Sequence, residues 1–104
     1  MRVITSVRGM MKETDPEAAK AAHNAIVASL ASVSQSLGAL GHQTFLNSQN
    51  PGEFLAIDTW PDMESLQGFM QHPADPAAKI ASMFAAAPDI TVWVESGYDG
   101  FLKA

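Results

Sequence analysis

The sequence has no cysteine, which excludes disulfide bonds, thiolate chemistry and cysteine-based zinc sites. It also lacks a nucleotide-binding glycine pattern, the G-x-S-x-G turn of many hydrolases and the H-E-x-x-H spacing of zinc peptidases. We expect no metal site and no cofactor. The N-terminal stretch MRVITSVRGMM holds only a short apolar run interrupted by Arg8, so we expect neither a signal peptide nor a membrane span, and a cytoplasmic location.

Charged residues are also few, at 16% of the chain, and they leave a net charge of −5. A negative chain argues against nucleic acid or an anionic membrane as the main partner. The low charge density, with 47% hydrophobic residues, indicates that some apolar surface is covered by a partner. At 104 residues, the chain is expected to form a single domain over residues 1–104.

Local patterns predict strands and helices along the whole chain. The first helix has a clear start, because Asp15 can cap it, Pro16 suits its first position and Glu17 complements its dipole. Its apolar residues recur at steps of three and four, and Gly38 ends it. The turn-rich NSQNPG at 47–52 predicts a hairpin loop. The expected strands are 3–8, 42–46, 53–60 and 90–95, and the expected helical segments are 15–37, 63–72 and 77–86.

This order predicts an α+β protein with the ferredoxin-like βαββαβ fold, in which helices cover one face of a four-stranded antiparallel sheet. The other face would carry Leu55, Ile57 and Thr59 and would be partly wet. We therefore expect a homodimer in which two sheets pack face to face and bury about 1,500 Å² or more.

Two motifs carry a family resemblance: the stretch EFLAIDTWPDMESLQGFM, residues 53–70, and the last strand TVWVE. With the hairpin before the first motif, they resemble the dimeric α/β-barrel superfamily, and within it the antibiotic biosynthesis monooxygenases. The resemblance implies a ligand pocket between sheet and helices, and activities that include cofactor-free oxygenation of polycyclic phenols, polyketide cyclisation, haem degradation and isomerisation. The tryptophan of the monooxygenases falls on Trp60, while the asparagine that accompanies it four residues earlier falls on Ala56.

Asp58 is an unexpected residue in the middle of the 53–60 strand. Alternation places it on the same face as Phe54, Ala56 and Trp60, so it does not reach water by pointing away from the apolar side. If this face meets the helices, the carboxylate needs a partner or a proton. His23, on the inner side of the first helix, is a candidate partner. A frayed strand end, with Asp58 bound to a backbone amide and His23 at the core edge, fits the sequence as well.

From these residues we expect a catalytic pair, His23 and Asp58, that removes a proton in a small apolar pocket. The expected substrate-binding residues are Trp60, Phe54, Phe69, Met83 and His72, although the aromatic residues and methionines also suit an ordinary core. The expected ligand is an aromatic or polyketide-like molecule, and the expected outcome is oxygenation or cyclisation. The alternative is a dimeric protein that binds a small ligand without catalysis.

Overall fold

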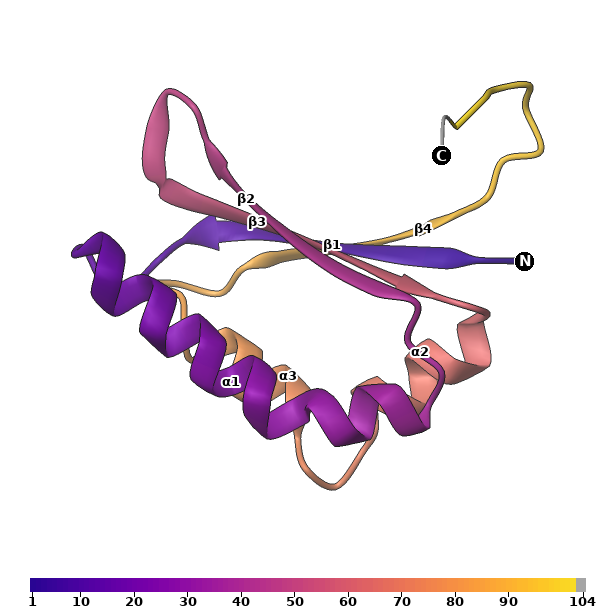
Figure 1. The fold of residues 1–104 in the computed structure, drawn as a ribbon, viewed down its shortest axis with the longest axis horizontal. Helices are drawn as coiled ribbons and strands as arrows, with labels where there is room; N and C mark the ends of the chain where they lie inside the picture. Colours follow the sequence, from indigo (N-terminus) through magenta and orange to yellow (C-terminus); the bar gives the residue numbers. More distant parts are fainter. Residues whose placement is uncertain (103–104) are drawn as a thin grey trace.

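One antiparallel sheet with the strand order β2-β3-β1-β4 forms the centre of the molecule (Figure 1). The computed structural model describes residues 1–102. The elements are β1 (Val3–Met10), α1 (Pro16–Ser36), β2 (Gly41–Asn47), β3 (Asn50–Trp60), α2 (Met63–Met70), α3 (Pro76–Ala81) and β4 (Asp89–Val94). All three helices lie on the same side of the sheet. The predicted ferredoxin-like α+β fold is thus confirmed.

The ends of α1 follow from single residues, as the sequence predicts. The Asp15 carboxylate accepts a hydrogen bond from the backbone amide of Ala18 at 2.9 Å, and Pro16 begins the helix. Gly38 follows the helix with a φ of +85°, a conformation that costs any residue with a Cβ atom. The backbone then turns toward β2, and just before this strand Leu40 donates to the Thr59 carbonyl at 2.8 Å.

Side chains alternate along β3, and one set of them faces the helices. Phe54, Ala56 and Trp60 are buried against them, with 5%, 5% and 3% of their surfaces exposed. Val7 and Val3 on β1, directly opposite Ala56 and Trp60 in the antiparallel register, are also buried. Asp58 shares this face and lies opposite Thr5. The sequence-based face assignment is therefore correct, and the core lies between the sheet and the helices.

Two predicted boundaries are wrong. The hairpin loop is shorter than expected, because β2 continues to Asn47 and β3 begins at Asn50. Pro51 fits within β3 because this part of the strand extends past the end of β1, so its missing N–H breaks no bond of the β1–β3 ladder. The last helix ends at Ala81 rather than near residue 86. The chain beyond it turns and then bridges to the end of β1, where Phe84 pairs with Met11 and the Ala85 amide donates to the Met10 carbonyl at 2.9 Å.

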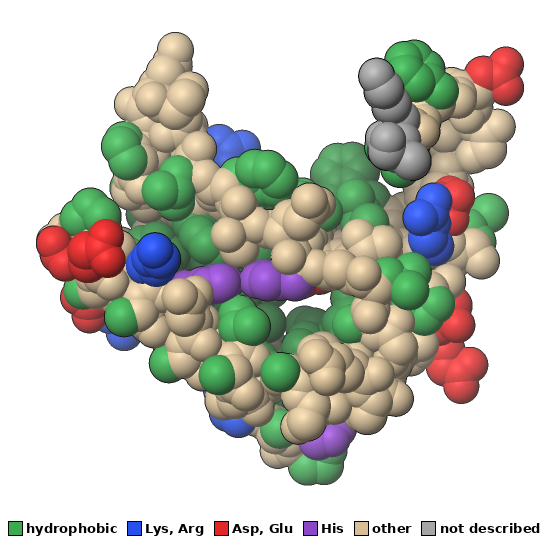
Figure 2. Space-filling model, viewed as in Figure 1, with side chains coloured by type: hydrophobic (Ala, Val, Ile, Leu, Met, Phe, Trp, Pro, Cys, Tyr) green, Lys and Arg blue, Asp and Glu red, His purple; other side chains and the backbone are tan. Residues whose placement is uncertain are grey.

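The face of the sheet turned away from the helices is open. Phe45 on β2 and Trp93 on β4 lie on it with 50% and 54% of their surfaces exposed. In the ribbon view, the β2–β3 hairpin and the C-terminal segment rise at the two ends of this face, and Figure 2 shows a broad trough between them. Within residues 1–102, no helix combines the length and apolar character needed to span a bilayer.

Candidate functional site

A cavity of about 310 Å³ lies between the helix-facing side of the sheet and the helices. Its walls are mostly apolar and come from every helix and strand: Leu30 of α1, Phe69 of α2, Ile80 of α3 and Trp60 of β3 are among them. The space-filling view shows a hollow here, with purple histidine side chains along its upper edge (Figure 2). The size suits a small organic molecule.

Three titratable side chains border the cavity and form a chain of hydrogen bonds. Nδ1 of His42 donates to Oδ1 of Asp58 at 2.5 Å, because a carboxylate can only accept. Nε2 of His42 lies 3.0 Å from Nε2 of His23, and Nδ1 of His23 lies 2.9 Å from Oδ1 of Asn24. Three elements supply these residues, α1, β2 and β3, so the chain forms only in the folded protein.

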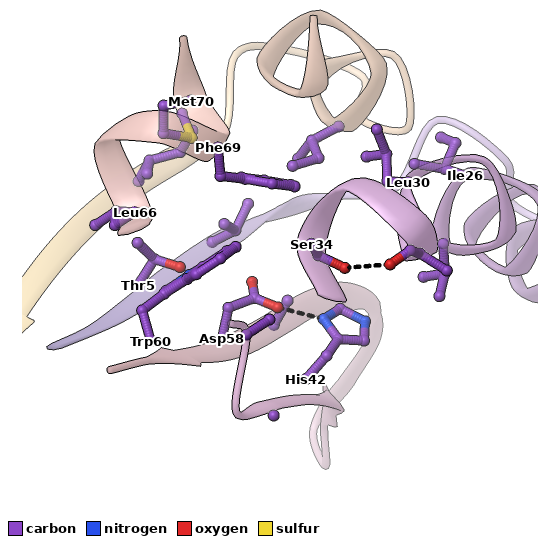
Figure 3. A pocket seen from close by; sticks show the side chains of 18 of the residues that line it. Thr5, Ile26, Leu30, Ser34, His42, Asp58, Trp60, Leu66, Phe69 and Met70 are labelled. Carbon is purple, nitrogen blue, oxygen red and sulfur yellow. Dashed lines mark hydrogen bonds and ion pairs between the residues drawn. The ribbon is translucent and has the colours of Figure 1, made fainter. Parts of the chain in front are cut away.

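The register of the sheet explains how His42 reaches Asp58. His42 on β2 is the direct antiparallel partner of Asp58 on β3, and partners on one face hold their side chains close together. The side chain of Asp58 is 24% exposed and that of His42 is 37% exposed. Figure 3 shows the other carboxylate oxygen of Asp58 turned away from His42 and toward the cavity.

The charge of His42 responds to this contact. Its hydrogen bond to Asp58 raises the pKa of His42 above the ordinary value; burial lowers that pKa in part, and the negative charge of Asp58 raises it further. The contact therefore favours the protonated form of the His42 imidazole.

Trp60 combines an aromatic ring in the cavity wall with a buried polar atom. Its ring packs against Phe69 with centroids 4.9 Å apart, and its Nε1 is buried with no hydrogen-bond partner among residues 1–102. Unpaired buried donors are uncommon in folded proteins. Trp60 also lines the cavity beside Thr5 and Asp58, as Figure 3 shows, so its ring is the part that a ligand can contact.

The structure places most of the sequence-predicted site residues around the cavity. Trp60, Phe54, Phe69 and Met83 line it, together with both members of the expected catalytic pair. His72 lies outside that lining, in the turn after α2, where its Nδ1 accepts a hydrogen bond from the Ala74 amide at 3.0 Å.

The expected pair does not make direct contact, because His42 lies between His23 and Asp58. Sequence reasoning gave His42 no role in the pocket, although it opens the strand that pairs with the Asp58 strand. Counting back from the hairpin would not have found it, because the β2–β3 register shifts between Leu46 and Asn47. Among residues 1–102, no group of three or more His, Cys, Asp or Glu side chains is arranged to hold a metal ion.

A ferredoxin-like sheet with a ligand-sized cavity under its helices defines the class of protein. Residues 6–79 match the family model described as antibiotic biosynthesis monooxygenase. This match spans well over half of the chain, so the protein belongs to the antibiotic biosynthesis monooxygenase family. No curated protein matches the sequence.

Several solved structures have the same fold at low sequence identity. SnoaB, a cofactor-independent oxygenase from Streptomyces nogalater, is 13% identical with a TM-score of 0.70, over 93% of this chain and 95% of its own. Rv0793 of Mycobacterium tuberculosis is 13% identical with a TM-score of 0.68, over 96% and 100%. A Methanosarcina mazei protein is 14% identical with a TM-score of 0.68, over 92% and 94%. At these identities the likeness establishes the fold.

Proposed function

We propose that the protein is an enzyme that oxygenates an aromatic or polyketide-like phenol in this cavity without a metal or organic cofactor. The observation that carries the proposal is a single carboxylate, Asp58, in the wall of a mostly apolar cavity, with a protonatable imidazole bound behind it. Family membership supports this reading, and SnoaB, which has the same fold, is described as a cofactor-independent oxygenase.

Proton removal is the step for which the site is best suited. In the proposed reaction, Asp58 takes a proton from a CH₂ carbon of the keto form of the phenol, and the resulting carbanion adds dioxygen. Asp58 then returns the proton to the peroxide, which loses water and leaves a carbonyl at that carbon. Both oxygen atoms are accounted for, and no outside reductant is needed. Asp58 would supply the polar group that the family places at position 56, where this chain has Ala56.

Trp60 and Phe54 are the proposed supports for the substrate ring. Both are rigid aromatic side chains on the same face of β3 as Asp58, so a flat ring held against them lies beside the carboxylate. Phe69 and Met83 would complete the apolar wall.

The test combines binding with oxygen consumption. A panel of polycyclic phenols and quinones is offered to chelator-treated protein, and bound ligand is detected by native mass spectrometry. Asp58→Asn keeps the side-chain shape, so it should retain binding and lose oxygen uptake by a factor of about 10² or more. Glu13→Gln removes one carboxylate from an exposed loop and should behave like the parent.

Two other results would contradict the proposal that the protein is this enzyme. Binding without oxygen uptake, unchanged in Asp58→Asn, would identify a small-ligand-binding protein. Absence of binding throughout the panel would show that the cavity does not receive aromatic compounds.

We also propose that the working form is a homodimer joined through the open face of the sheet. The exposed aromatic residues Phe45 and Trp93 lie on this face, and the trough between the hairpin and the C-terminal segment can receive a second sheet (Figure 2). The low charge density of the sequence supports the same assembly.

A further inference from the structure

The rings of His23 and His42, beside the cavity, approach each other in an unusual geometry. Their ring planes differ by only 10°, their centroids are 5.2 Å apart, and their Nε2 atoms are 3.0 Å apart. Parallel rings in a face-to-face stack cannot combine so short an N–N distance with so long a centroid spacing. The rings of His23 and His42 therefore lie nearly in one plane, with the two Nε2 atoms head-on.

The other ring nitrogens determine where the protons are. Nδ1 of His42 faces Oδ1 of Asp58, and Nδ1 of His23 faces Oδ1 of Asn24. Both oxygens are acceptors, so both Nδ1 atoms carry hydrogen. If both rings were neutral, two Nε2 lone pairs would then oppose each other at 3.0 Å. A cation between them removes this repulsion.

A proton fits between the two Nε2 atoms better than a metal ion does. Two histidines that bind one metal direct their lone pairs toward a third point, whereas these lone pairs point at each other. Among the described residues 1–102, no third ligand completes a metal site. A linear N–H···N hydrogen bond is the arrangement that the head-on geometry allows.

We propose that His23 and His42 share one proton between their Nε2 atoms and act together as the counter-cation that positions Asp58. The inference rests on the proposed function for its use in catalysis, but the shared proton can be measured without any substrate. His42 holds Oδ1, which leaves the other oxygen of Asp58 free toward the cavity. His23 and Asn24 hold His42 in the tautomer and charge state that this contact needs. All three are positioning residues.

The shared charge also fits both halves of the proposed reaction. Before proton removal, the cation stabilises the carboxylate form of Asp58. Once Asp58 carries the substrate proton, the adjacent cation has lost its counter-charge and favours release of that proton to the peroxide. The charged or titratable groups that face His42 are Asp58 from β3 and His23 from α1, and the next charged residue along α1 is Lys20.

The direction in which the titration midpoint of His42 shifts tests whether the two histidines share a proton. His23→Leu removes the acceptor of the shared proton, so the titration midpoint of His42, followed by two-dimensional NMR of the ring signals, should fall by roughly half to one pH unit. His23→Gln is close in size and offers an amide oxygen in place of Nε2, so it should keep the midpoint near that of the parent. If the histidines instead carried separate charges that repel, His23→Leu would raise the midpoint, and the inference would be overturned.

Asn24→Ala gives a second measurement that does not alter either histidine. Without its acceptor, the His23 ring can carry its hydrogen on Nε2 and donate to a neutral His42, so the midpoint of His42 should again fall. An unchanged midpoint in both Asn24→Ala and His23→Leu also overturns the proposal. Because these readings need no substrate, they can fail while oxygen uptake persists, or hold while no substrate is oxygenated. In a protein that does turn over, His23→Leu should shift the pH–rate profile, and His23→Gln should restore it.

Discussion

Truncation of Trp60 tests the core and the cavity together. Trp60 is 3% exposed and belongs to a buried cluster that also contains Val3, Leu30, Leu66 and Phe69. Removal of a buried tryptophan costs about 3–5 kcal/mol, a figure that includes the empty space left behind. The Trp60 ring already borders the cavity, so fewer neighbours are lost on that side than in a close-packed core. We therefore expect Trp60→Ala to lower the free energy of unfolding by about 3 kcal/mol.

The measurement is urea and thermal unfolding of the parent and the variant. For a domain of this size, about 3 kcal/mol corresponds to a fall in Tm of more than about 10 °C. A loss below about 1 kcal/mol would refute the buried position of Trp60 and with it the face assignment of β3.

The matched control is Trp93→Ala, which removes the same side chain from the open face, where Trp93 is 54% exposed and its Nε1 donates to Ser6 Oγ at 2.8 Å. It should cost the folded chain about 1 kcal/mol or less. A larger loss that disappears on dilution would belong to subunit association, which makes stability depend on concentration.

Three further predictions concern the His42–Asp58 pair, the dimer and Gly38. The His42–Asp58 pair should stabilise the protein most below pH ~6.5 and lose this contribution as pH rises through the raised pKa of His42; unfolding curves of the parent and Asp58→Asn from pH ~6 to ~8 should therefore converge as pH rises. Light scattering at micromolar concentration should give about twice the chain mass of 11.1 kDa, and Phe45→Asp should halve it; a parent mass of one chain would contradict the dimer. Gly38→Ala should cost about 1 kcal/mol in chemical unfolding because φ at this position is +85°, and an unchanged midpoint would show that the loop relaxes freely.

The fold could be predicted because each element carries its own local signal. Asp15 and Pro16 define the start of α1, and Gly38 defines its end, without help from the rest of the chain. The errors occurred where tertiary contacts prevail over local preference. Residues 82–86 have a helical composition, but Met83 and Phe84 are buried beside the end of β1, where the bridge between Phe84 and Met11 takes the place of another helical turn.

The site was predictable only in part, for a related reason. Alternation along one strand was enough to place Asp58 and Trp60 on the helix-facing side, because a strand has a fixed period. The identity of the Asp58 partner depends instead on the register between two strands. Counting back from the Asn47–Asn50 pair at the hairpin would place His42 opposite Leu55, and the register shift between Leu46 and Asn47 brings it opposite Asp58 instead.

The position of His42 changes what the carboxylate can do. A direct pair of His23 and Asp58 would use the histidine as the base, with the carboxylate behind it. The observed order reverses these roles, because the imidazoles lie behind the carboxylate and one oxygen of Asp58 is left facing the cavity. In the proposed reaction, the histidine pair holds Oδ1 and leaves the other oxygen of Asp58 next to the aromatic surface of Trp60, where a substrate ring would bind.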